Sequence, residues 1–207
     1  SIESGNNSVF SNCTFNKVSN TGNFYAHAVY IYKIYEAIFD GCIFMDCGDN
    51  NGKYVIQVNS LRKIHSVKFE FLSCIINFTN PQFSAGGIQT NSAIVFSIIN
   101  STFKNCHMNG NDQACGIKFN TYKSSICSSC PVTITGCIFD NFIEGNGRAM
   151  YINIARLLTI SNCTIKNMPN GDYLIIINPI SYQLEKIVLD NVIFIDNKVS
   201  CSNYQGL

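Results

Sequence analysis

The chain has 207 residues and a net charge of +1, from 14 Lys and Arg against 13 Asp and Glu. The basic residues are scattered and form no stripe, so the charge pattern of a nucleic-acid-binding protein is missing. Hydrophobic residues make up 46% of the chain, which is enough to fill a core. No run of 18 apolar residues occurs, so we expect no membrane-spanning segment.

A short motif recurs seven times in fixed register. Each copy has an anchor residue, a large apolar residue three positions before it and another two positions after it. The intervals between anchors are 29, 32, 27, 36, 26 and 29 residues. A loose period of roughly 30 residues from end to end indicates one solenoid domain over residues 1–207. The anchors are Cys13, Cys42, Cys74, Ser101, Cys137, Cys163 and Val192.

Each coil is predicted to hold three short strands. In the first coil, Phe10 lies before the anchor and Phe15 after it, and a third apolar stretch follows at 28–31. The third stretch recurs at 55–58, 87–90, 116–119, 149–152 and 174–177. The pair before the anchor recurs at 69–71, 96–98, 132–134, 158–160 and 187–189. Alternation within each stretch sends every second side chain inward.

Asn or Gly precedes most anchors, which predicts a repeated tight corner because these residues tolerate left-handed backbone. The residues are Asn12, Gly41, Asn100, Gly136, Asn162 and Asn191. Crossovers between parallel strands are right-handed in nearly all proteins, and the hexapeptide repeat of left-handed β-helices is absent. The predicted fold is therefore all-β: a right-handed parallel β-helix solenoid of about seven coils, each of roughly 30 residues.

The longest interval, between Ser101 and Cys137, predicts an irregular loop near 121–130. Neither terminus carries an amphipathic segment to cover the last coil, although an open strand edge favours aggregation. The sequence starts at Ser1 without Met or a signal-like segment. We therefore expect a segment of a longer chain or a subunit that stacks end to end.

Eleven cysteines divide into two groups. Those at anchor positions are predicted to form a buried ladder of compact apolar thiols: Cys13, Cys42, Cys74, Cys137 and Cys163. The others are disulfide candidates in an oxidising compartment: Cys47, Cys106, Cys115, Cys127, Cys130 and Cys201. The spacing of Cys127 and Cys130 also suits zinc or redox motifs, but no second pair accompanies it, so a loop disulfide is favoured.

A search for catalytic residues gives little. Asp46 and Asp49 are the closest carboxylate pair of the kind that glycoside hydrolysis needs, but they fall in a turn-like segment. His27, His65 and His107 occupy unrelated places in three coils. We therefore predict no catalytic residue, no metal site and no cofactor.

The outward position after the anchor is β-branched in all seven coils, with Thr at 14, 102 and 164. Strand propensity alone explains such a row. The alternative is an interaction stripe for a neighbouring domain or protomer, formed by Ile43, Ile75, Ile138 and Ile193. Five sequons mark possible N-glycosylation sites, of which three share the corner before the anchor: Asn6, Asn12, Asn77, Asn100 and Asn162.

Four segments carry a resemblance to polymorphic outer-membrane repeat proteins, whose short motifs are of the FxxN and GGAI types. They are Phe103–Cys106, Phe139–Asn141, Phe194–Asn197 and Ala85–Ile88. Similar repeats occur in β-helical surface proteins of some protists. The resemblance covers essentially the whole chain and implies a pectin-lyase-like β-helix used in surface adhesion or as a spacer.

Together these features favour a non-enzymatic structural or adhesive module of an extracellular surface protein or filamentous appendage. Its partners would be other protein chains, neighbouring repeats of the same chain and possible glycans, bound through lateral and end-to-end contacts. Two alternatives stay open because β-helices host them: a polysaccharide lyase or hydrolase, and a carbohydrate-binding module. An outward carboxylate cluster would favour the enzyme, and a row of exposed aromatics on adjacent coils the binding module.

Overall fold

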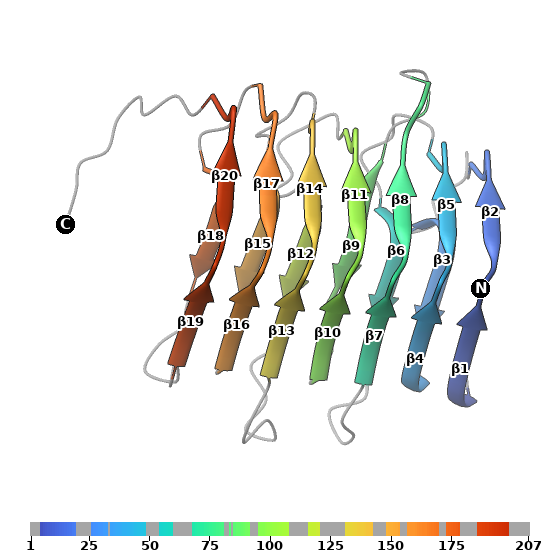
Figure 1. The fold of residues 1–207 in the computed structure, drawn as a ribbon. Coiled ribbons are helices and arrows are strands. Elements are labelled where there is room, and N and C mark those ends of the chain that lie inside the picture. The colour runs from blue at the N-terminus through green and yellow to red at the C-terminus, as the bar shows by residue number, and fades with distance from the viewer. Residues whose placement is uncertain are drawn as a thin grey trace.

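The strands stack as a parallel β-solenoid in which the coils follow one another along one axis (Figure 1). The computed structural model describes residues 5–19, 26–32, 34–48, 54–59, 68–80, 83, 85–91, 95–107, 116–120, 131–142, 148–153, 157–169, 173–178 and 186–198. These residues contain strands and turns and no helix. The loop expected near 121–130 lies outside them.

Three parallel sheets form the walls of the solenoid. The first wall contains β1 (Gly5–Ser11), β4 (Ile34–Asp40), β7 (Lys68–Leu72), β10 (Val95–Ile99), β13 (Pro131–Thr135), β16 (Leu157–Ser161) and β19 (Lys186–Asp190). The second contains β2 (Thr14–Asn16), β5 (Ile43–Met45), β8 (Ile75–Asn77), β11 (Thr102–Lys104), β14 (Ile138–Asp140), β17 (Thr164–Lys166) and β20 (Ile193–Ile195). The third contains β3 (Ala26–Tyr32), β6 (Tyr54–Asn59), β9 (Gly86–Thr90), β12 (Ile117–Asn120), β15 (Met150–Asn153) and β18 (Ile175–Asn178).

The predicted register is confirmed. Phe10 pairs with Phe39, which pairs with Phe71, and the column continues in steps of one coil to Leu189. The column that starts at Phe15 continues in the same way to Phe194. Seven strands in each of these two walls give the seven coils that the repeat predicts.

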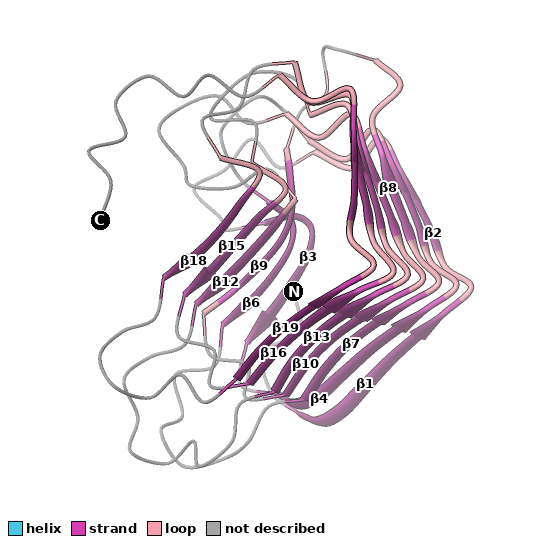
Figure 2. Ribbon diagram, turned by 60° about the vertical axis from the view of Figure 1, so that its left-hand side comes forward, coloured by secondary structure: helices cyan, strands magenta, loops and turns pink. Residues whose placement is uncertain are grey.

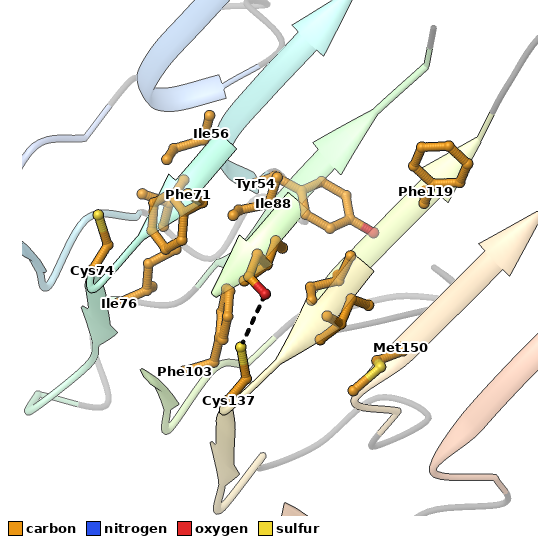
Figure 3. Close-up of a cluster of buried hydrophobic side chains, with 14 of the residues drawn as sticks. Tyr54, Ile56, Phe71, Cys74, Ile76, Ile88, Phe103, Phe119, Cys137 and Met150 are labelled. Carbon is orange, nitrogen blue, oxygen red and sulfur yellow. Dashed lines mark hydrogen bonds between the residues drawn. The ribbon is translucent and has the colours of Figure 1, made fainter. Parts of the chain in front are cut away.

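The core lies between the walls, which enclose it on three sides (Figure 2). Identical positions in successive coils stack like with like. The rings of Phe10 and Phe39 lie parallel with centroids 4.5 Å apart, and those of Phe103 and Phe139 lie 5.1 Å apart. Offset stacking of this kind adds about 0.5–1.5 kcal/mol per pair beyond the burial of apolar area. Figure 3 shows this interior, with side chains from all three walls pointing inward.

The corner between the first and second walls has left-handed backbone in every coil. Its φ angles lie between 49° and 66°. The residues are Asn12, Gly41, Ser73, Asn100, Gly136, Asn162 and Asn191. The sequence did not predict left-handed backbone at Ser73, because Ser has no marked preference for this conformation. Six coils have a second left-handed residue four positions after the anchor: Lys17, Asp46, Asn105, Asn141, Asn167 and Asp196.

Backbone hydrogen bonds join these corners from coil to coil. The left-handed corner residue donates to the coil that follows, as from Asn12 N to Asp40 O at 2.8 Å. The residue after the anchor donates to the preceding anchor, as from Ile43 N to Cys13 O at 2.9 Å. The position four after the anchor donates forward again, as from Lys17 N to Met45 O at 2.9 Å. All three bonds recur at each of the six junctions between coils.

Gly136→Ala tests this corner. We expect it to lower the free energy of unfolding by about 2–3 kcal/mol, because an L side chain at φ 66° is strained and the new Cβ would collide with Asn100 Oδ1 of the preceding coil. Urea unfolding measures the loss. Ser73→Ala is the matched control, since this corner already carries a side chain at φ 50°, and its loss should stay below about 0.5 kcal/mol. Equal losses for the two variants would contradict the explanation.

Candidate functional site

The anchor thiols form the predicted interior column. Cys42, Cys74, Cys137 and Cys163 are buried, whereas Cys13 is only partly buried because it belongs to the first coil. The column also contains hydrogen bonds that the sequence did not reveal. Cys137 Sγ donates to Ile98 O of the preceding coil at 3.5 Å, as the dashed line in Figure 3 shows.

The hydrogen bonds of Ser101 explain why a small side chain with a hydrogen-bond donor occupies the anchor position. Its hydroxyl donates to Phe71 O at 3.2 Å and also lies 2.9 Å from Ile99 O. Cys42 makes the equivalent bond to Phe10 O at 3.4 Å. A thiol or hydroxyl therefore satisfies a buried carbonyl and still fits the tight corner, which explains the choice better than compactness alone.

Burial makes these thiols poor nucleophiles. It raises the pKa of Cys42, and it raises the pKa of Cys74 to about 12. A hydrogen bond with Cys163 and burial together raise the pKa of Cys137. The same hydrogen bond lowers the pKa of Cys163 to about 7, but this thiol is as buried as its neighbours. Since an accessible thiolate is the reactive form, the buried column is structural.

Thiol labelling should distinguish the buried thiols of the column from Cys13, the partly buried thiol of the first coil. In the native protein at pH 7.5, maleimide should modify Cys13 at least about a hundred times faster than Cys74, which reacts only when the coils open. Peptide mass spectrometry after short exposure identifies the labelled positions, and labelling in urea is the control. Comparable native rates for the two thiols would contradict the burial of the column.

The structure does not support a disulfide between Cys47 and Cys106. Both are buried thiols in the same inward column, five positions after their anchors. They belong to coils two steps apart, a separation of about 10 Å, whereas a disulfide requires Cα atoms within about 7 Å. Their shared place in the repeat thus reflects a common packing position. The other candidates, Cys115, Cys127, Cys130 and Cys201, lie outside the described residues.

Asp46 has a structural role in the turn after the second wall. Its carboxylate accepts bonds from Thr79 N at 2.6 Å, Thr79 Oγ1 at 2.8 Å and Asn80 N at 3.1 Å. Burial opposes ionisation, but these donors outweigh it and hold the pKa of Asp46 below its usual value. The carboxylate thus fastens one coil to the next. Asp49, the other member of the predicted pair, lies outside the described residues.

This bonding gives Asp46 a pH-dependent share of stability. Because the folded pKa is lowered, the contribution is complete above the unfolded pKa of about 4 and is lost as the pH falls through the folded value. Asp46→Asn should therefore lower the free energy of unfolding by about 1–3 kcal/mol at pH 7 and by much less near pH 2. Urea unfolding at the two pH values provides the measurement. A difference from wild type that does not change with pH would contradict the role of the carboxylate.

Asn and Asp side chains form a further ladder along the second wall, which sequence reasoning missed. Asn141 Nδ2 donates to Asn105 Oδ1 at 2.7 Å, and Asn105 Nδ2 donates to Phe78 O at 2.8 Å. Asn167 Nδ2 donates to Asp140 Oδ1 at 2.8 Å, so this carboxylate is also engaged between coils. The signal was present as a recurrent Asn four positions after the anchor.

The sequon asparagines occupy different environments. Asn12, Asn100 and Asn162 are exposed at the corner before the anchor. Asn77 is partly buried, and its Oδ1 accepts a bond from Asn105 Nδ2 at 3.2 Å. The sequon at Asn6 falls in β1. The three corner sequons are therefore the accessible ones among those whose side chains are described.

The predicted isoleucine stripe is one straight row on the outer face of the second wall. Pairing joins Thr14, Ile43, Ile75, Thr102, Ile138, Thr164 and Ile193 in register. Ile75, Ile138 and Ile193 are 39%, 38% and 47% exposed, and Ile43 is partly buried. We call these seven outward positions, isoleucines and threonines together, the isoleucine row. Neighbouring members of a wall lie about 4.8 Å apart, so the row is continuous.

Other chemistry is sparse in the part of the chain that the structure describes. No three His, Cys, Asp or Glu side chains there come together as metal ligands. Nor does that part contain a helix with the length and hydropathy that crossing a bilayer requires. His65 lies outside it, and His27 and His107 belong to the first and fourth coils.

Comparisons with family models, with curated proteins and with solved structures found no match. The solenoid and its outer surfaces are therefore the features that bear on function.

Proposed function

We propose that this protein is a non-enzymatic structural or adhesive module of an extracellular surface protein or filamentous appendage. It acts as a rod that binds other chains along its side and at its ends. The isoleucine row carries the proposal. The described interior is filled by stacked side chains, so the chemistry available to a partner lies on the outer walls.

The geometry of the row supports lateral binding. Its exposed isoleucines all project from one flat parallel sheet whose strand spacing is fixed by the coil junctions. The threonines between them are also β-branched, so the face has a regular, rigid profile. A preorganised apolar face loses little conformational entropy on binding, which favours a protein partner with a complementary face.

The location outside the cell and the finer kinship with pectin-lyase-like surface repeats belong to the same proposal. The resemblance of the FxxN and GGAI segments supports both. Exposed sequons at three corners suit a secreted chain that carries glycans, and the right-handed sense of the coil follows the general rule for parallel crossovers.

Replacing Ile75 and Ile138 by Lys tests lateral binding. The double variant should keep the wild-type circular dichroism and melting temperature, because both side chains point outward, and should weaken lateral association about tenfold or more, because a buried charge is costly. Sedimentation velocity over a concentration series measures self-association, and pull-down from the native surface measures partner binding. Thr133→Lys, on the outer face of the first wall, is the matched control. Binding that is unchanged in the double variant would refute the role of the row.

A further inference from the structure

Two sequons of the inner coils place their asparagines at the corner that borders the isoleucine row. Asn100 belongs to the fourth coil and Asn162 to the sixth, and both residues are exposed. The third residue of each sequon is a member of the row, Thr102 or Thr164. In these two coils the acceptor asparagine therefore lies only two residues from the row.

The fold leaves the amide nitrogen of both asparagines accessible. Asn100 Oδ1 points toward the next coil, where it occupies the space that a Cβ on Gly136 would need, so Nδ2 points away from that coil. Asn162 Oδ1 accepts a bond from Asn191 Nδ2 at 2.8 Å. Within the residues that the structure describes, Nδ2 makes no hydrogen bond at Asn100 or at Asn162. This nitrogen is the atom that carries an N-linked glycan.

Ile138, one of the exposed members of the row, lies between the two sequon coils. It pairs with Thr102 on one side and with Thr164 on the other. Neighbouring strands lie about 4.8 Å apart, and two residues of extended chain span at most about 7 Å. The Cα atoms of Asn100 and Asn162 therefore both lie within about 9 Å of the Cα atom of Ile138.

Ile75, the other exposed isoleucine of the inner coils, has a sequon coil on one side only. It pairs with Thr102 of that coil and with Ile43 on the other side. A branched oligosaccharide is much larger than one coil step, so a glycan on Asn100 would reach the outer face beside both exposed isoleucines.

We propose that N-glycans on Asn100 and Asn162 control access to the isoleucine row. This inference rests on the proposed function and names a regulation of its lateral site. A hydrated oligosaccharide beside Ile138 keeps a flat partner face away from it, because the partner has to displace the sugar and its water before it can contact the row. The glycosylated chain thus binds weakly along this side, and loss of the glycans exposes the row.

The modification needs one co-reactant, an oligosaccharide carried on a lipid pyrophosphate. The bond between sugar C1 and the pyrophosphate oxygen breaks, and a bond between C1 and the asparagine Nδ2 forms. The proton that Nδ2 loses leaves with the released lipid pyrophosphate. The sequon also requires the hydroxyl two residues after the asparagine, which Thr102→Ser keeps.

Glycopeptide mass spectrometry of the protein from its native source measures whether the two sites are occupied. We expect an oligosaccharide mass on both Asn100 and Asn162, and treatment with a glycan-cleaving amidase should convert both residues to aspartate. Unmodified asparagine at either position would overturn the inference and leave the lateral function standing.

Replacing both acceptors by glycine tests their effect on binding, in a secreting host that attaches N-glycans. Glycine already occupies this left-handed corner at positions 41 and 136, so the variant should fold, which circular dichroism and melting curves check. We expect Asn100→Gly with Asn162→Gly to associate laterally about tenfold or more tightly than glycosylated wild type by sedimentation velocity. Thr102→Ser with Thr164→Ser is the matched control, since it keeps both sequons, and it should stay within about twofold of wild type.

A further variant distinguishes this inference from the proposed function. Ile75→Lys with Ile138→Lys, added to the glycan-free variant, should abolish the gain in association. If the glycan-free variant binds no more tightly than the serine control, the inference is overturned alone. If the two lysines leave the binding of the glycan-free variant unchanged, the lateral function is refuted and the inference with it.

Discussion

Three backbone hydrogen bonds at each junction between coils hold every coil to the next, and the rest of the structure depends on them. They require left-handed backbone before the anchor, which explains the Asn and Gly residues there. They also fix the register, so a residue in one coil lies directly over its counterpart in the next. The anchor then has to be small, and at Cys42, Ser101, Cys137 and Cys163 its thiol or hydroxyl also donates to a carbonyl of the preceding coil.

Because the register is fixed, side chains of one kind stack in columns that continue from coil to coil. Inward columns stack Phe and Ile into a filled core, which also buries the thiols of Cys42, Cys74, Cys137 and Cys163. Polar columns, such as the Asn ladder and the Asp46 bonds to Thr79, fasten the coils laterally. The outward column of isoleucines faces solvent. The proposed lateral contact uses a column that already exists within the chain.

The periodicity was enough to predict the three walls, the strand register and the buried anchors, since a side chain repeated in seven coils leaves a clear pattern. Features that depend on one coil were not predictable. Ser73 adopts the left-handed corner because its neighbours impose it, against weak local preference. Cys47 and Cys106 looked like disulfide candidates because sequence shows their shared position but not the two-coil distance between them. The role of Asp46 depends on where Thr79 falls in the following coil, which spacing alone does not give.

The distance between the two ends of the isoleucine row tests the central claim most directly. Spin labels carried by unnatural amino acids at positions 14 and 193 can be measured by pulsed electron resonance, with excess unlabelled protein to remove contacts between copies. Six coil steps of about 4.8 Å predict a narrow distribution near about 29 Å, apart from the length of the label arms. A distance near about 10 Å, as between the facing sheets of a sandwich, or a broad distribution would contradict in-register stacking.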